Sequence, residues 1–98
     1  MSLGPDEVRD VVFDRAWLAR RGYDEAAVDA LLDRLEATLR GLDDLSAEEV
    51  NEATFPRPRL GRRGYSARAV DDFLTRARAA LRRRRRAGRR LPSTRSAG

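Results

Sequence analysis

The chain has 98 residues and a formal net charge of +5. A chain of this length holds one small domain or two very small units, and it buries only a modest core. It contains no cysteine and no histidine, which removes disulfides, thiol nucleophiles, the usual zinc ligands and the commonest general base at neutral pH. We therefore expect a protein that is not an enzyme and that holds no metal or cofactor.

Charge is distributed unevenly along the chain. Residues 1–50 carry 6 arginines and 13 acidic residues, a net charge of −7, whereas residues 51–98 carry 15 arginines and 3 acidic residues, a net charge of +12. This asymmetry indicates an anionic partner for the second half, either lipid headgroups or nucleic acid, and it would allow head-to-tail contact between the halves. Because no long apolar run and no signal-peptide pattern is present, we expect a cytoplasmic protein without a membrane-spanning helix.

An internal repeat organises the chain. Shifting the sequence by 42 residues, the separation of Phe13 and Phe55, brings about half of the aligned residues onto identical ones without a gap. Self-similarity of this kind indicates two copies of one supersecondary unit. We assign repeat 1 to residues 3–42, repeat 2 to residues 45–84 and a disordered arginine-rich tail to residues 85–98. The identical residues of repeat 1 include Leu3, Glu7, Val8, Phe13, Leu18, Arg20, Arg21, Gly22, Tyr23, Val28, Asp29, Leu32 and Leu39.

Each repeat predicts a short helix, a loop and a longer helix. Pro5 is suited to the first turn of the first short helix. Ser46 and Glu49 form a capping-box pattern at the start of the second, in which each side chain satisfies a free backbone N–H group. We expect the two short helices to end near Phe13 and Phe55.

The long helices are predicted to start at Asp24 and Ser66, which are suitable N-caps. Apolar residues then recur at spacings of four and three, which draws one seam along each helix. We expect an all-α fold of two helix-loop-helix repeats, with the long helices paired as a short coiled coil. The pairing is either within one chain, as a pseudo-twofold unit, or between chains, as a homodimer or a longer assembly. The seam residues are Val28, Leu32, Leu35 and Leu39 in repeat 1, and Val70, Leu74, Ala77 and Leu81 in repeat 2.

The Gly-Tyr pair before each long helix has a structural interpretation. Gly22 and Gly64 supply a positive backbone dihedral or a close approach of two segments. Each tyrosine packs on Phe13 or Phe55 at the helix entry. Asp29 and its counterpart in repeat 2 lack a partner base or metal ligands, so we expect them to pair with an arginine or to cap a loop rather than to do chemistry.

Both repeats resemble the signature of the DivIVA N-terminal domain, in particular its actinobacterial branch. The segments that carry the resemblance are FDRAWLARRGYDEAAVDALL and FPRPRLGRRGYSARAVDDFL. They share a phenylalanine, a basic and apolar loop, Arg-Gly-Tyr, a helix start and Val-Asp. The preceding segments LGPDEV and LSAEEV also resemble the family's opening, and the resemblance covers about residues 3 to 82.

This resemblance implies a cell-division protein that associates with the inner face of the membrane at the septum or the cell pole. It would act there as an adaptor and bind a DivIVA-type scaffold or another division protein. It also implies membrane contact through the loop before each Gly-Tyr, where apolar burial and attraction to anionic lipid add together. The matching loop residues are Leu18, Arg20 and Arg21 in repeat 1, and Leu60, Arg62 and Arg63 in repeat 2. Trp17 adds an indole that is suited to the headgroup region of a membrane.

Several alternatives remain open at the level of sequence. Trp17, Leu18 and Leu60 would otherwise fold back to cover the short helices. The run from Arg82 to Arg86 is a solvated tail, a membrane-surface patch or a nonspecific nucleic-acid patch. For the whole protein, the alternatives are a soluble protein-interaction module without membrane binding and a basic nucleic-acid-binding protein.

Overall fold

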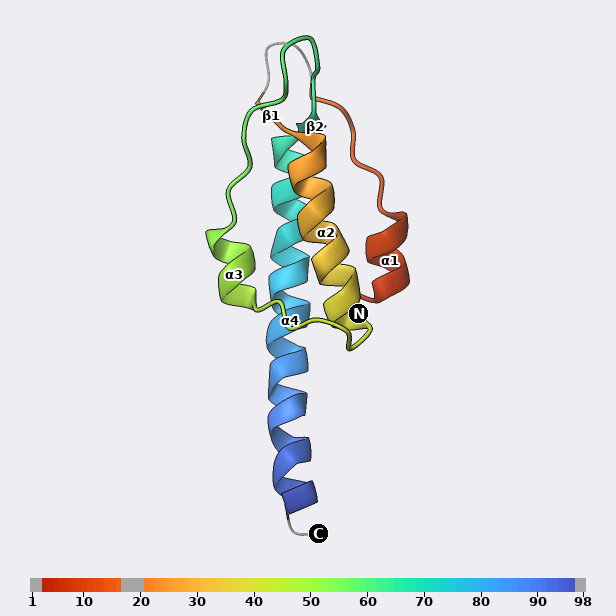
Figure 1. The fold of residues 1–98 in the computed structure, drawn as a ribbon, viewed down its shortest axis with the longest axis vertical. Helices are drawn as coiled ribbons and strands as arrows, with labels where there is room; N and C mark the ends of the chain where they lie inside the picture. The colour runs from red at the N-terminus through yellow and green to blue at the C-terminus, as the bar shows by residue number, and fades with distance from the viewer. Residues whose placement is uncertain (1–2, 17–20, 97–98) are drawn as a thin grey trace.

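The computed structural model describes residues 3–16 and 21–96, with side chains described as far as Arg86. Figure 1 shows α2 and α4 side by side at the centre and running in the same direction, with α1 beside α2 and α3 beside α4. Each repeat therefore contributes one short and one long helix to an elongated bundle. The elements are α1 (Pro5–Asp10), β1 (Gly22–Tyr23), α2 (Glu25–Leu39), α3 (Ala47–Glu52), β2 (Tyr65–Ser66) and α4 (Ala67–Ser96).

The predicted helix starts are confirmed. Pro5 occupies the first turn of α1, and Ser46 with Glu49 forms a capping box in which both hydrogen bonds are present. Asp24 and Ser66 each accept a hydrogen bond from the backbone N–H three residues further on, at 3.2 and 3.3 Å. These side chains satisfy backbone donors that the first turn of a helix leaves free.

The predicted all-α fold is wrong, because the structure contains a small antiparallel sheet. β1 pairs with β2, with Gly22 opposite Ser66 and Tyr23 opposite Tyr65. Each loop thus reaches the other repeat before its long helix begins, and backbone groups of the two segments are satisfied across the molecule rather than within one repeat. The chain is therefore not a pure coiled-coil repeat.

Helix ends also differ from the predicted ones. α1 ends at Asp10 and α3 at Glu52, each three residues before the expected phenylalanine. Val11 already has an extended backbone, which is consistent with the low helix propensity of β-branched residues. α4 continues to Ser96, whereas the sequence predicts a disordered tail over residues 85–98. Arginine is a strong helix former, so the packed part of α4 can propagate through Arg82–Arg86.

The seams of both long helices lie in one core. Val28, Leu35, Val70 and Ala77 are at most 1% exposed, and every other seam residue is buried except Leu39, which is partly buried. Burying a leucine or valine side chain contributes about 1.5–3 kcal/mol relative to leaving it exposed. The seams therefore meet inside a single chain, with α1 and α3 covering them from the two flanks.

The two repeats exchange hydrogen bonds through their tyrosines. The Tyr23 hydroxyl of repeat 1 donates to Asp71 Oδ1 of repeat 2 at 2.8 Å. The Tyr65 hydroxyl of repeat 2 donates to Asp29 Oδ1 of repeat 1 at 2.9 Å. Because both partners are shifted by the same 42 residues, the two bonds are equivalent under a pseudo-twofold axis. Among the residues that the structure describes, neither aspartate makes an ion pair with an arginine, and each accepts a hydrogen bond from a tyrosine instead, so that expectation was wrong.

The aromatic rings of the two repeats also contact each other. The Tyr23 ring lies 5.0 Å from the ring of Phe55, and the Tyr65 ring lies 5.4 Å from the ring of Phe13. The sequence left open which phenylalanine each tyrosine contacts, and the structure places each on that of the other repeat. Tilted pairs of this kind contribute beyond the apolar area that they bury.

The turn between the repeats has a defined geometry. α2 closes with a Schellman motif, in which Leu42 N–H donates to the Ala37 carbonyl at 2.8 Å and Gly41 N–H donates to that of Thr38 at 3.0 Å. Gly41 has a φ of +85°, the left-handed conformation that this motif requires. The buried Thr38 hydroxyl then accepts from Leu45 N–H at 2.9 Å. These bonds stop α2 and direct the chain back toward α3.

We expect Tyr23→Phe and Tyr65→Phe each to lower the free energy of unfolding by about 1 kcal/mol, because each keeps the ring and removes one hydrogen bond. The two losses should be similar, since the bonds are equivalent under the pseudo-twofold axis. Denaturant titration measures both. Two unchanged midpoints would contradict the exchange between repeats.

The same variants have a pH signature. Burial raises the pKa of Tyr23 and Tyr65 above the usual 10.0, and the hydrogen-bonded aspartate raises it further. A group with a raised folded-state pKa contributes stability that is fully present below pH 10 and is lost as the pH rises through the folded-state value. The free energy of unfolding of the wild-type chain should therefore fall at alkaline pH. In a double variant that carries both Tyr23→Phe and Tyr65→Phe it should fall less steeply.

Candidate functional site

The loop of repeat 2 forms one end of the molecule, the green segment at the top of Figure 1. At its apex Arg62 N–H donates to the Arg59 carbonyl at 2.9 Å, which closes a four-residue turn. Gly61 has a φ of +83°, as the third position of a type II turn requires. Leu60 occupies the second position and is 103% exposed. It does not fold back on the short helix, which removes that alternative for this residue.

Four exposed arginines surround Leu60 in sequence: Arg57, Arg59, Arg62 and Arg63. Among the residues that the structure describes, no carboxylate lies within ion-pairing distance of these four. We call residues 57–63 the loop tip. It presents one apolar side chain among cations that are available to an external anion.

The strands fix the position of the loop tip. Gly64 has a φ of +71°, and a Cβ added there would lie 2.3 Å from the Tyr23 carbonyl oxygen and 2.5 Å from Pro58 Cγ. A Cβ at Gly22 would lie 2.4 Å from the Arg63 carbonyl oxygen. The two glycines are therefore required by close backbone approach, and Gly64 also by its dihedral, as the sequence predicted.

The predicted loop site is only partly described. Trp17, Leu18 and Arg20 lie outside the described residues. Arg21 is exposed, and its guanidinium carbon lies 5.9 Å from the centre of the Tyr23 ring. The structure brings Leu60, Arg62 and Arg63 together at the loop tip.

Sequence reasoning missed Arg57 and Arg59, because it carried over only positions of the family signature. The signal was present in the Pro-Arg-Pro-Arg stretch before Leu60, since prolines hold the backbone extended and leave the intervening arginines on the surface.

A second basic region lies on α4. Arg82–Arg86 are all exposed, and we call them the arginine stem. Five consecutive helical positions point in all directions around the axis, so the stem is cationic on every side. Arg85 makes an ion pair with Glu48 at 3.5 Å. Figure 1 shows α4 continuing past the end of α2, away from the loop tip. From Ala67 to Arg82 α4 runs for about 22 Å at 1.5 Å per residue, so the two basic regions are well separated.

Among the described residues, no group of three or more acidic side chains could hold a metal ion. No helix in that part of the chain is long and apolar enough to cross a membrane.

Comparisons of this chain with protein-family models, with curated proteins and with solved structures found no match. The resemblance of the two repeats to the DivIVA signature therefore stays a prediction.

The positioning of the loop tip can be tested at Gly64. Gly64→Ala should destabilise the chain by more than about 1 kcal/mol, because its Cβ meets backbone atoms and its dihedral is left-handed. Gly4→Ala is the matched control, since a Cβ there meets nothing within 4 Å. Thermal unfolding measures both. Equal midpoints for the two variants would contradict the close approach of the strands.

Proposed function

We propose that this chain is a non-enzymatic, DivIVA-like adaptor that attaches to the anionic inner face of the cell membrane through its loop tip. It would act at the septum or the cell pole and hold a DivIVA-type scaffold or another division protein there. The proposal joins the repeat pattern, which resembles the DivIVA signature, to one structural observation.

That observation is the full exposure of Leu60 at the apex of a turn between arginines. An exposed leucine gains about 1.5–3 kcal/mol when it leaves water. Each basic residue near an anionic membrane surface adds about 1 kcal/mol. Apolar insertion and charge attraction therefore act at the same place, which is the combination that binds a peripheral protein to an anionic interface.

The orientation of the fold supports an adaptor role. With the loop tip on a membrane, α2 and α4 lead away from the surface, because both long helices begin beside the strands and run in the same direction (Figure 1). The far end, with the arginine stem and the turn between the repeats, then stays available to a partner. The sequence of repeat 1 offers Trp17 and Leu18 at the matching loop, and two weak contacts on one chain strengthen each other through avidity.

Vesicle co-sedimentation tests this proposal. The full chain should carry Arg82→Gln, Arg83→Gln and Arg86→Gln as a common background, because these changes lower nonspecific attraction by the stem. Added Leu60→Ser should weaken binding to vesicles of phosphatidylglycerol and phosphatidylcholine about tenfold, which corresponds to about 1.4 kcal/mol.

Leu42→Ser is the matched control. Leu42 is 79% exposed and lies in the turn between the repeats, at the opposite end of the bundle from the loop tip, so its substitution should leave binding unchanged. Equal binding by the two variants would contradict a membrane role for the loop tip. So would equal binding to vesicles of pure phosphatidylcholine, and a soluble protein-interaction module would then be the better proposal.

A further inference from the structure

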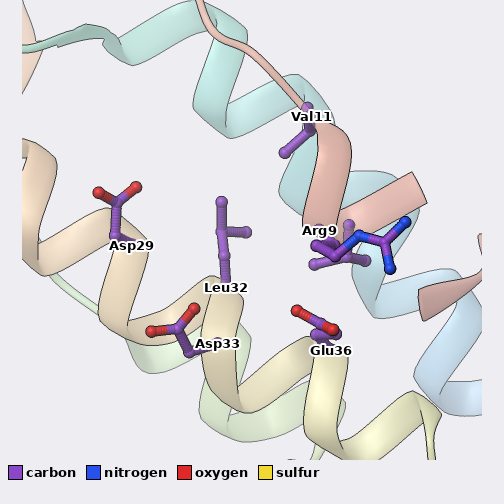
Figure 2. A pocket seen from close by; sticks show the side chains of 7 residues that line it. Arg9, Val11, Asp29, Leu32, Asp33 and Glu36 are labelled. Carbon is purple, nitrogen blue, oxygen red and sulfur yellow. The ribbon is translucent and has the colours of Figure 1, made fainter. Parts of the chain in front are cut away.

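A groove lies between α1 and α2 on the flank of repeat 1, with a volume of about 350 Å³. Figure 2 shows Leu32 of α2 and Val11, just after α1, pointing into the same space. Three carboxylates from α2 border it, and Arg9 lies across from them on α1. We call it the acidic groove. Its lining residues are Val8, Arg9, Val11, Asp29, Leu32, Asp33 and Glu36.

The three carboxylates share one face of α2. Asp29, Asp33 and Glu36 are spaced by four and three residues, so they lie on successive turns. Asp29 uses Oδ1 for the Tyr65 bond and keeps Oδ2. Glu36 pairs with Arg40. Asp33 is exposed and makes no ion pair with any residue that the structure describes.

The fold itself does not require this charge. Repeat 2 has the same architecture, yet it carries Thr75 where repeat 1 has Asp33, and Arg78 where repeat 1 has Glu36. Both repeats pack their long helix against a short helix. The acidic groove is therefore a property of repeat 1 alone, and its rim carries three carboxylates and one arginine.

The arginine stem has complementary chemistry. Arg82 and Arg86 are four residues apart, which is the spacing of Asp29 and Asp33 on α2. The stem spans about 6 Å along α4 at 1.5 Å per residue, which is also the distance along α2 from Asp29 to Asp33.

We propose that the acidic groove of one copy binds the arginine stem of a second copy of this chain. Guanidinium groups would pair with the carboxylates, while arginine methylene groups cover the partly exposed Val11. In its own chain α4 runs on past the bundle (Figure 1), so the stem reaches the groove only of another molecule. Groove and stem are different surfaces, and such a contact repeats into open head-to-tail chains.

Sedimentation velocity of the full chain tests this contact at two ionic strengths. At about 20 mM salt surface charges act over longer distances than at about 500 mM, where screening is strong. The wild-type chain should therefore show a sedimentation coefficient that rises with protein concentration at low salt and returns to the monomer value at high salt.

Three variants locate the contact. The groove variant, Asp33→Thr with Glu36→Arg, carries the residues that repeat 2 already has at these places, so the architecture tolerates them. The stem variant carries Arg82→Gln, Arg83→Gln and Arg86→Gln, which leaves the ion pair of Arg85 with Glu48 in place. The control variant changes three arginines of the loop tip to glutamine: Arg57, Arg59 and Arg62.

The groove and stem variants should each remain monomeric at low salt, whereas the control variant should assemble like the wild type. An equimolar mixture of groove and stem variants should form a dimer and stop there, because the mixture joins one intact stem to one intact groove. A wild-type chain that stays monomeric at low salt would overturn the proposal. Loss of assembly in the control variant, or a mixture that stays monomeric, would overturn it too. These outcomes do not depend on vesicle binding, which reports on the loop tip.

Discussion

Each loop of this chain reaches the other repeat before its own long helix begins, and the arrangement of the bundle depends on that exchange. Ser66 N–H donates to the Asp14 carbonyl at 2.8 Å, and Asp24 N–H donates to the Pro56 carbonyl at 3.0 Å. With the β1–β2 pair, these bonds hold the starts of α2 and α4 at one level. The seams then meet in parallel, the loop tip lies beyond the strands, and the arginine stem is left at the far end.

Local features of this fold could be predicted from the sequence, and features that join distant segments could not. Asp24 and Ser66 act within three residues, so their capping roles are visible in the chain itself. The pairing of Tyr23 with Tyr65 spans 42 residues, and a strand of two residues has no alternating pattern to reveal it.

The same difference between local features and features that join distant segments holds for the candidate site. Leu60, Arg62 and Arg63 could be placed in a loop from the family signature, but the exposure of Leu60 depends on the turn that Gly61 completes. The acidic groove required the structure, because it lies between two helices and is distinguished by a comparison of repeats. Repeats that share one backbone have thus diverged in charge, and this gives one molecule a basic loop tip, an acidic flank and a basic stem.

The central claim is that the two repeats pair with each other inside one chain, through their seams, strands and tyrosines. Sedimentation equilibrium at about 500 mM salt, where contacts between surface charges are screened, tests it most directly. Pairing of the repeats within one chain predicts a molecular mass of 11.1 kDa that does not change with protein concentration. A mass of twice that value under these conditions would contradict the account, because the seams and tyrosines would then be paired between chains.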